Sequence, residues 1–174
     1  MRIFSASIAL IIALAGPAAA QPLNEGDAVP PHMREGELHV DPYEISNENA
    51  GADPISDPSV LAAFNGREGI ARIVDSFVEG VRTDPRTEKI FAASDWVRLT
   101  RTLNEQFCYI LGGGCDYTGR DMKDVHRDHG VTTAEFAAVV EILQAAMNEE
   151  GVPFRMQNRL LAKLAPMKRD TVTR

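Results

Sequence analysis

The chain has 174 residues, 44% of them hydrophobic, and a formal net charge of −7 at pH 7. This length predicts one domain with appendages. The acidic excess lies in residues 21–57, which hold nine acidic residues and one base, whereas residues 58–174 hold sixteen of each. Because the larger part is formally neutral and has no basic stripe, the composition argues against nucleic-acid binding.

The first twenty residues have the pattern of a secretory signal peptide. Met1-Arg2 is a short basic start, residues 3–15 are apolar, and small residues end at Ala20 before Gln21. The apolar run is short for a membrane span, which needs roughly 20 residues, so cleavage after Ala20 is favoured over an uncleaved anchor. We therefore expect an exported protein, periplasmic or secreted, with no membrane insertion after cleavage.

Residues 21–57 form an acidic lead-in that contains five prolines and no sustained helical period. This composition predicts a mostly irregular segment. The stretch HVDPYEI, residues 39–45, is apolar enough that we expect it on the surface of the following domain. The lead-in also carries His32 and His39, which we interpret as solvated side chains rather than metal ligands.

Residues 58–174 have the pattern of an all-α domain. Asp57-Pro58 predicts the start of a short helix that Asn65-Gly66 ends. Longer helices are predicted over 66–82, 95–111 and 133–150, because their apolar residues recur at helical spacing. We expect Ser94 to cap the second of these, Thr132 and Glu135 to form a capping box on the third, and a last helix to run from Pro153 to Pro166. No strand with sustained alternation is found.

The only two cysteines, Cys108 and Cys115, flank three consecutive glycines, residues 112–114. Export would place them in an oxidising compartment, which favours a disulfide. Its small loop would stabilise the fold by roughly 2–3 kcal/mol in the chain-entropy model. Two free thiols or a redox pair are the alternatives.

Residues 117–131, YTGRDMKDVHRDHGV, carry the other two histidines, His126 and His129. The segment is too short to bury a face of its own and lies between two long predicted helices. An all-α protein can use such a segment to present an imidazole to an iron porphyrin. The alternative for His126 is a hydrogen-bonded core or surface residue. We interpret His129, three residues further on, as solvated or near a haem propionate.

The motif YTGRDMKDVH, preceded by Gly112-Gly113 and followed by a helix with Phe136 near its start, resembles the proximal segment of the group I truncated haemoglobins. With His126 placed at the proximal histidine, residues 61–170 align with the family pattern, without a gap as far back as Asn65-Gly66. The resemblance implies a two-over-two helical sandwich with haem between the 95–111 helix and the His126 segment.

The resemblance also implies the site. His126 would be the axial ligand of the haem iron, and Phe91 would stack on the porphyrin. No catalytic residue is implied. The implied haem-binding residues are Phe91, Leu99, Leu103, Phe107, Tyr117, Met122, Val125 and His126.

The chain departs from the family pattern on the distal side of the haem. Val78 stands where the family usually has a tyrosine whose hydroxyl holds oxygen, and Leu99 and Leu103 stand where polar groups often occur. Gln106 is the nearest polar residue on that face. Hydrogen-bond donors on the distal side decide whether a haem iron binds its ligand or activates it. We therefore expect an unusually apolar distal pocket. Such a pocket would bind oxygen weakly, whereas the binding of CO or NO would be less affected by the missing donors.

These observations predict a haem protein that binds oxygen, NO or CO at the iron. Turnover of NO with oxygen is a candidate activity, and an electron-donor protein is a candidate partner. Two alternatives remain open. One is a haem-free, disulfide-stapled helical interaction module on a globin scaffold, and the other is a redox haem protein with a second axial ligand.

Overall fold

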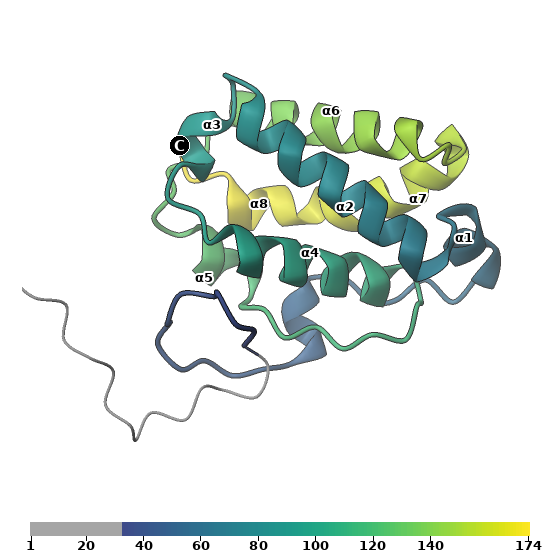
Figure 1. Ribbon diagram of the computed structural model, residues 1–174, viewed down its shortest axis with the longest axis horizontal. Coiled ribbons are helices and arrows are strands. Elements are labelled where there is room, and N and C mark those ends of the chain that lie inside the picture. Colours follow the sequence, from purple (N-terminus) through teal and green to yellow (C-terminus); the bar gives the residue numbers. More distant parts are fainter. Residues whose placement is uncertain (1–32) are drawn as a thin grey trace, which may run out of the picture. The chain divides into compact units, whose positions relative to one another are not determined.

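The structure, a computed structural model, describes residues 33–174. The predicted signal peptide and residues 21–32 lie outside the described residues. Throughout the described range the regular secondary structure is helical, and it contains no strand (Figure 1). The elements in chain order are η1 (Asn47–Ala50), α1 (Pro58–Ala63), α2 (Gly66–Thr83), α3 (Glu88–Phe91), α4 (Trp96–Ile110), α5 (Met122–His126), α6 (Thr133–Glu149), α7 (Phe154–Leu164), η2 (Ala165–Met167) and α8 (Lys168–Thr171).

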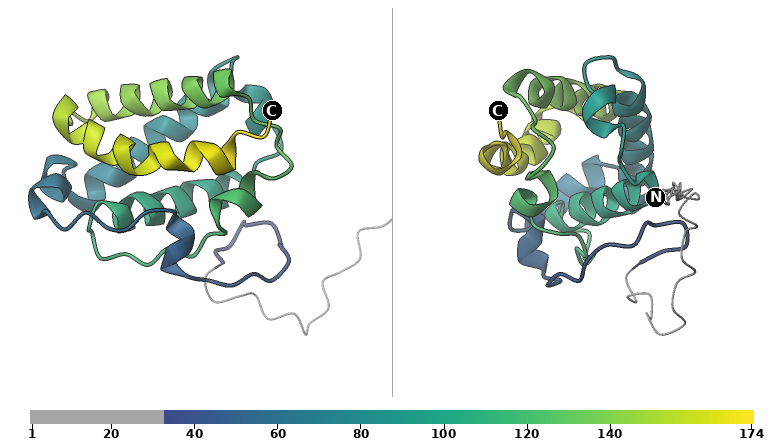
Figure 2. Two further views of the ribbon diagram at one scale, coloured as in Figure 1. Left: turned by 180° about the vertical axis from the view of Figure 1, so that it is seen from behind. Right: turned by 90° about the vertical axis from the view of Figure 1, so that its left-hand side faces the viewer.

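Four long helices form two packed pairs. Helix α2 packs against α4, and α6 packs against α7, while α2 also lies along α6 and α4 also touches α7. Figure 2 shows the two pairs facing each other, with the short α5 beside one end of α4. The predicted all-α class and the two-over-two arrangement are confirmed.

One face of α2 contributes a stripe of apolar residues to the core. Ile70, Ile73 and Phe77 lie on one stripe of this helix and are buried, because residues three, four and seven apart share a face. One apolar residue of the last helix does not join the core. Phe154 is 67% exposed, since it is the first residue of α7 and precedes the part of the helix that packs.

The helix ends agree with the predictions except at the start of α4 and at Pro166, beyond which helical structure continues through η2 and α8. The predicted cap, Ser94, is wrong: Asp95 is the N-cap, and its carboxylate accepts a hydrogen bond from the Arg98 amide at 3.0 Å. Both residue types can cap a helix, and the aspartate adds a negative charge at the positive end of the helix dipole. The capping box of Thr132 and Glu135 on α6 is confirmed.

The described part of the lead-in, residues 33–57, is mostly irregular but firmly attached. The Ile55 amide donates to the Ile110 carbonyl at the end of α4 (2.8 Å). The Asn49 side chain donates to the Gly119 carbonyl at 3.2 Å. The segment therefore runs beside α4 and the loop before α5 (Figure 1). Among residues 33–174, no helix is long and apolar enough to cross a membrane.

Candidate functional site

His126 ends α5, a helix of 5 residues that begins at Met122. Asp121 caps this helix by accepting a hydrogen bond from the Asp124 amide at 2.9 Å. The Nδ1 atom of His126 lies 2.7 Å from the Met122 carbonyl oxygen. A carbonyl only accepts hydrogen bonds, so Nδ1 carries the proton and Nε2 is the nitrogen left with a free lone pair.

The surroundings of His126 favour the neutral imidazole. Burial lowers the pKa of His126, the hydrogen bond to Met122 opposes this shift, and the nearby His129 lowers the pKa further. The two rings lie edge to face with centroids 6.4 Å apart. A neutral imidazole with a fixed tautomer is what a metal ligand requires.

Two cavities meet at His126. An outer cavity of about 410 Å³ lies between the lead-in, the start of α4 and α5, and an inner cavity of about 370 Å³ lies among the four long helices. Ile90, Phe91 and Val131 also line both. All eight residues expected to bind haem line at least one of them. Leu99, Tyr117 and Val125 line the outer cavity, Leu103, Phe107 and Met122 line the inner one, and Phe91 and His126 line both.

The inner cavity is lined almost entirely by apolar side chains. Gln106 is an exception, but its side-chain amide donates to the Ala50 carbonyl at 2.9 Å and lies 3.6 Å from the Met122 sulfur. One of its two N–H donors is therefore used by the lead-in, and the same nitrogen also faces the sulfurs of Met122 and Met167. Val78, expected in the distal pocket, is half-buried against the core and does not line either cavity. Its neighbour Phe77 lines the inner one.

The outer cavity has a wall that the sequence did not reveal. Leu38, His39, Val40 and Tyr43 of the lead-in line it, opposite His126 and His129. The apolar character of residues 39–45 predicted a surface segment, but no periodicity or motif pointed to the site. The basic residues Arg98 and Arg120 also line this cavity.

The residues present fit a haem group. Within residues 33–174, no set of three or more His, Cys, Asp or Glu is placed to hold a metal ion. His126 offers one imidazole whose Nε2 is free, and this single nitrogen ligand would suit the iron of a haem group. The apolar lining of the inner cavity suits the hydrophobic ring of such a group.

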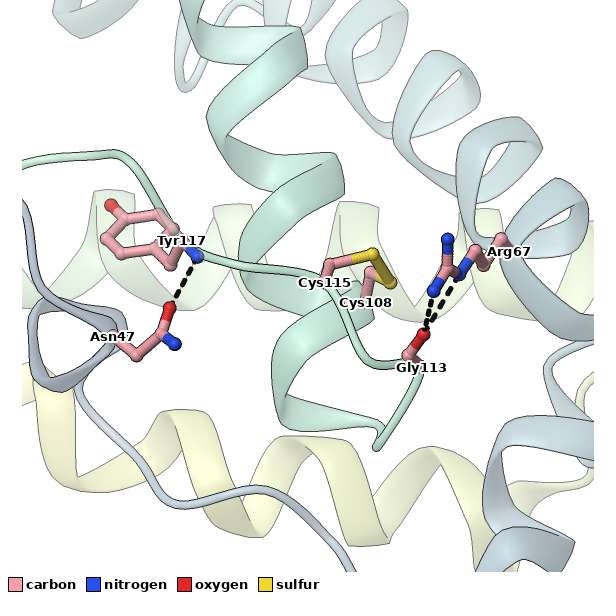
Figure 3. The surroundings of a disulfide bond; sticks show 6 residues. All are labelled: Asn47, Arg67, Cys108, Gly113, Cys115 and Tyr117. Atoms are coloured by element: carbon pink, nitrogen blue, oxygen red, sulfur yellow. Dashed lines mark hydrogen bonds between the residues drawn. A yellow bond between two sulfur atoms is a disulfide. The ribbon is translucent and has the colours of Figure 1, made fainter. Parts of the chain in front are cut away.

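The loop between α4 and α5 is anchored along its length (Figure 3). A disulfide joins Cys108 of α4 to Cys115 of this loop. Inside the loop that the disulfide closes, the Gly113 carbonyl accepts a hydrogen bond from Arg67 Nε at 2.9 Å, and after Cys115 the Tyr117 amide donates to the Asn47 side chain at 2.7 Å. A Cβ at Gly113 would lie 2.6 Å from the Cys108 sulfur, so the bridge leaves room only for glycine there. These contacts place Tyr117 at the outer cavity.

The chain is similar to known haem proteins. The family model described as "Bacterial-like globin" matches residues 59–173. A group 1 truncated haemoglobin of Mycolicibacterium paratuberculosis is 30% identical over 115 residues, which cover 66% of this chain and 85% of that protein. Another from Synechocystis is 34% identical over 94 residues, covering 52% and 76%.

Solved structures show the same fold. The truncated haemoglobin of Tetrahymena pyriformis in its Fe(III) form superimposes with a TM-score of 0.63 at 23% identity, covering 66% of this chain and 98% of that one. The 2/2 haemoglobin of Synechococcus, in the cyanomet state and with covalently attached haem, gives a TM-score of 0.60 at 21% identity, with the same coverage of both chains.

Proposed function

Because the chain belongs to the bacterial-like globin family, and within it to the group 1 truncated haemoglobins, we propose that it binds haem between α4 and α5 with His126 as the only proximal ligand. One observation carries this proposal. The Met122 carbonyl fixes the proton on Nδ1 of His126, at 2.7 Å, and so leaves Nε2 for the iron. The meeting of two cavities at this imidazole supports the assignment.

The bound iron would offer a coordination position for a diatomic gas. The chain's contribution on the α4 side is to exclude water and to offer few hydrogen-bond donors. Leu99, Leu103 and Phe107 on α4 are apolar, and the amide of Gln106 is bonded to Ala50. A missing hydrogen bond to a strongly polarised acceptor costs about 1.5–3 kcal/mol. We propose that oxygen is released roughly tenfold to a hundredfold faster than from a relative with a donor, whereas the less polar CO is affected little.

The proposal is tested by titrating the purified apoprotein with haem and recording visible spectra. We expect one haem per chain, an intense Soret band, and a further shift when the reduced form is exposed to CO. A chain that takes up no haem in a defined ratio would instead be the haem-free interaction module.

A redox haem protein with two axial ligands is the second candidate, since His39 lines the outer cavity together with His126. In that case the reduced protein would show a six-coordinate spectrum in the absence of gas. Changing His39 to Ala would then convert it to a five-coordinate one. An unchanged spectrum in the variant would rule out His39 as a ligand.

A further inference from the structure

The lead-in segment of residues 37–43 lines the outer cavity although it precedes the globin-like helices. We propose that this segment is a wall of the haem site and slows the loss of haem. The inference rests on the proposed function, because it requires haem to reach the outer cavity. It adds a part of the site that lies outside residues 59–173, which the family model matches.

The segment is fixed at its start by a buried ion pair. The Glu37 side chain is 0% exposed and pairs with Arg101 of α4, whose side chain is 2% exposed. Arg101 also pairs with Glu105 at 3.0 Å and donates to the Thr118 hydroxyl. Removing one partner of a buried ion pair leaves an uncompensated charge and is strongly unfavourable. Glu37 is therefore held at one place on α4.

The next residue is held by its backbone while its side chain stays free of the core. The Leu38 amide donates to the Asp95 carboxylate at 2.7 Å, and the Leu38 carbonyl accepts a hydrogen bond from Arg98. The leucine side chain is nonetheless 64% exposed, and it lines the outer cavity. Two hydrogen bonds to charged groups thus hold an apolar side chain at the cavity, where a flat apolar ligand would cover it.

The segment is fixed again at its far end. The Tyr43 hydroxyl donates to the Thr118 carbonyl at 2.7 Å. The Arg120 guanidinium lies 5.2 Å from the centre of the Tyr43 ring and donates to the Asp41 carbonyl at 3.1 Å. The segment therefore spans from α4 to the loop before α5, the two elements between which haem is proposed to lie.

A wall tied to both sides of the site would hinder haem from leaving. Leu38 would bury apolar surface only when haem is present, so its contribution would appear in the bound state and not in the apoprotein. This difference separates a role toward haem from a purely structural role of the segment.

The test compares Leu38→Ser with Phe154→Ser in the full chain. Phe154 is a matched control because it is 67% exposed and does not line either cavity. The rate of haem transfer to an excess of apomyoglobin is measured for both, together with the melting temperature of each apoprotein. We expect Leu38→Ser to lose haem roughly tenfold faster, which corresponds to about 1.4 kcal/mol. Phe154→Ser should lose haem at the unmodified rate, and both apoproteins should melt as the unmodified one does.

A second measurement needs no variant. Hydrogen exchange of the Leu38 amide, which donates to Asp95, is recorded in the apoprotein before and after haem is added. Slower exchange with haem supports the wall. Haem loss from Leu38→Ser at the unmodified rate, or unchanged exchange at Leu38 in a haem-loaded chain, would overturn it. Failure to take up haem at all would overturn the proposed function instead.

Discussion

Leu103 is the residue through which the apolar character of the α4 side can be tested. It lines the inner cavity together with His126. Leu103→Gln would add a donor there, and we expect oxygen to be released about tenfold more slowly because a hydrogen bond to a polarised ligand is gained. CO release should change little. Both rates are measured by stopped-flow displacement, with Leu103→Met as a control that keeps volume without adding a donor.

A variant that removes the amide of Gln106 tests whether this residue donates to the bound gas. Its amide bonds the carbonyl of Ala50, a residue that is 0% exposed. Gln106→Leu should therefore leave a buried acceptor unpaired and lower the free energy of unfolding by about 1–3 kcal/mol, while oxygen release stays unchanged. If oxygen instead leaves this variant much faster, Gln106 is a distal donor and the account of that side is wrong.

Single residues also show which parts of the two cavities could be predicted from the sequence and which could not. His126 and its neighbours were predicted from a motif that keeps their spacing in the chain, and all eight predicted residues line the two cavities. Val78 was placed in the pocket by alignment alone. In the structure it lies next to Phe77 on α2, is half-buried against the core and does not line either cavity.

The lead-in is attached to α4 by charged groups, with Glu37 paired to Arg101 and Arg98. Burial raises the pKa of Glu37, but hydrogen bonds and ion pairs with Arg101 and Arg98 outweigh it and hold the pKa below 4.5. A carboxylate whose pKa is lowered by folding stabilises the fold above its unfolded pKa, and this stability is lost as the pH falls through the folded value. The attachment of the lead-in should therefore weaken below pH 4.5.

This pH dependence can be isolated with Glu37→Gln. The variant should be less stable than the unmodified apoprotein at pH 7, and the difference in free energy of unfolding should shrink as the pH falls below 4.5. Urea unfolding at a series of pH values measures it. The control is Glu35→Gln, which removes the same charge from an exposed position. A difference that is constant with pH would contradict the role given to the Glu37 carboxylate.

The disulfide joins the end of α4 to the loop before α5. Its formation in the cell requires the oxidising compartment to which the chain is predicted to be exported. Replacing Cys108 and Cys115 together by Ala should lower the free energy of unfolding by roughly 2–3 kcal/mol in the chain-entropy model. Chemical denaturation measures the loss. Thiol counting on denatured, unreduced protein from its native compartment should find none, and two free thiols there would rule out the bridge.

Among the elements, the sequence predicted those that depend on local pattern. The long helices follow from apolar residues at helical spacing, and the capping box of Thr132 is visible in the chain itself. The wall of the outer cavity could not be predicted, because its contacts join residues far apart in the chain. Leu38 meets Asp95 across 57 positions and Glu37 meets Arg101 across 64. Neither pair lies on a repeating pattern.

The fold as a whole explains why the two cavities meet at His126. The two helix pairs pack through a core of residues such as Ile70, Ile73 and Leu143, and residues of both α4 and α5 line each of the two cavities. The resemblance of the motif around His126 to the group I family predicted the two-over-two layout of the helices. The central hypothesis is that one imidazole on α5, that of His126, holds the haem iron.

That claim is tested most directly by the visible spectrum of the His126→Gly variant with and without added imidazole. We expect the variant to lose haem or its normal Soret band, and free imidazole to restore the band in part by filling the space of the deleted side chain. His129→Ala, the matched control on the neighbouring ring, should keep the unmodified spectrum. An unmodified spectrum in His126→Gly, or loss of haem from His129→Ala alone, would contradict the account.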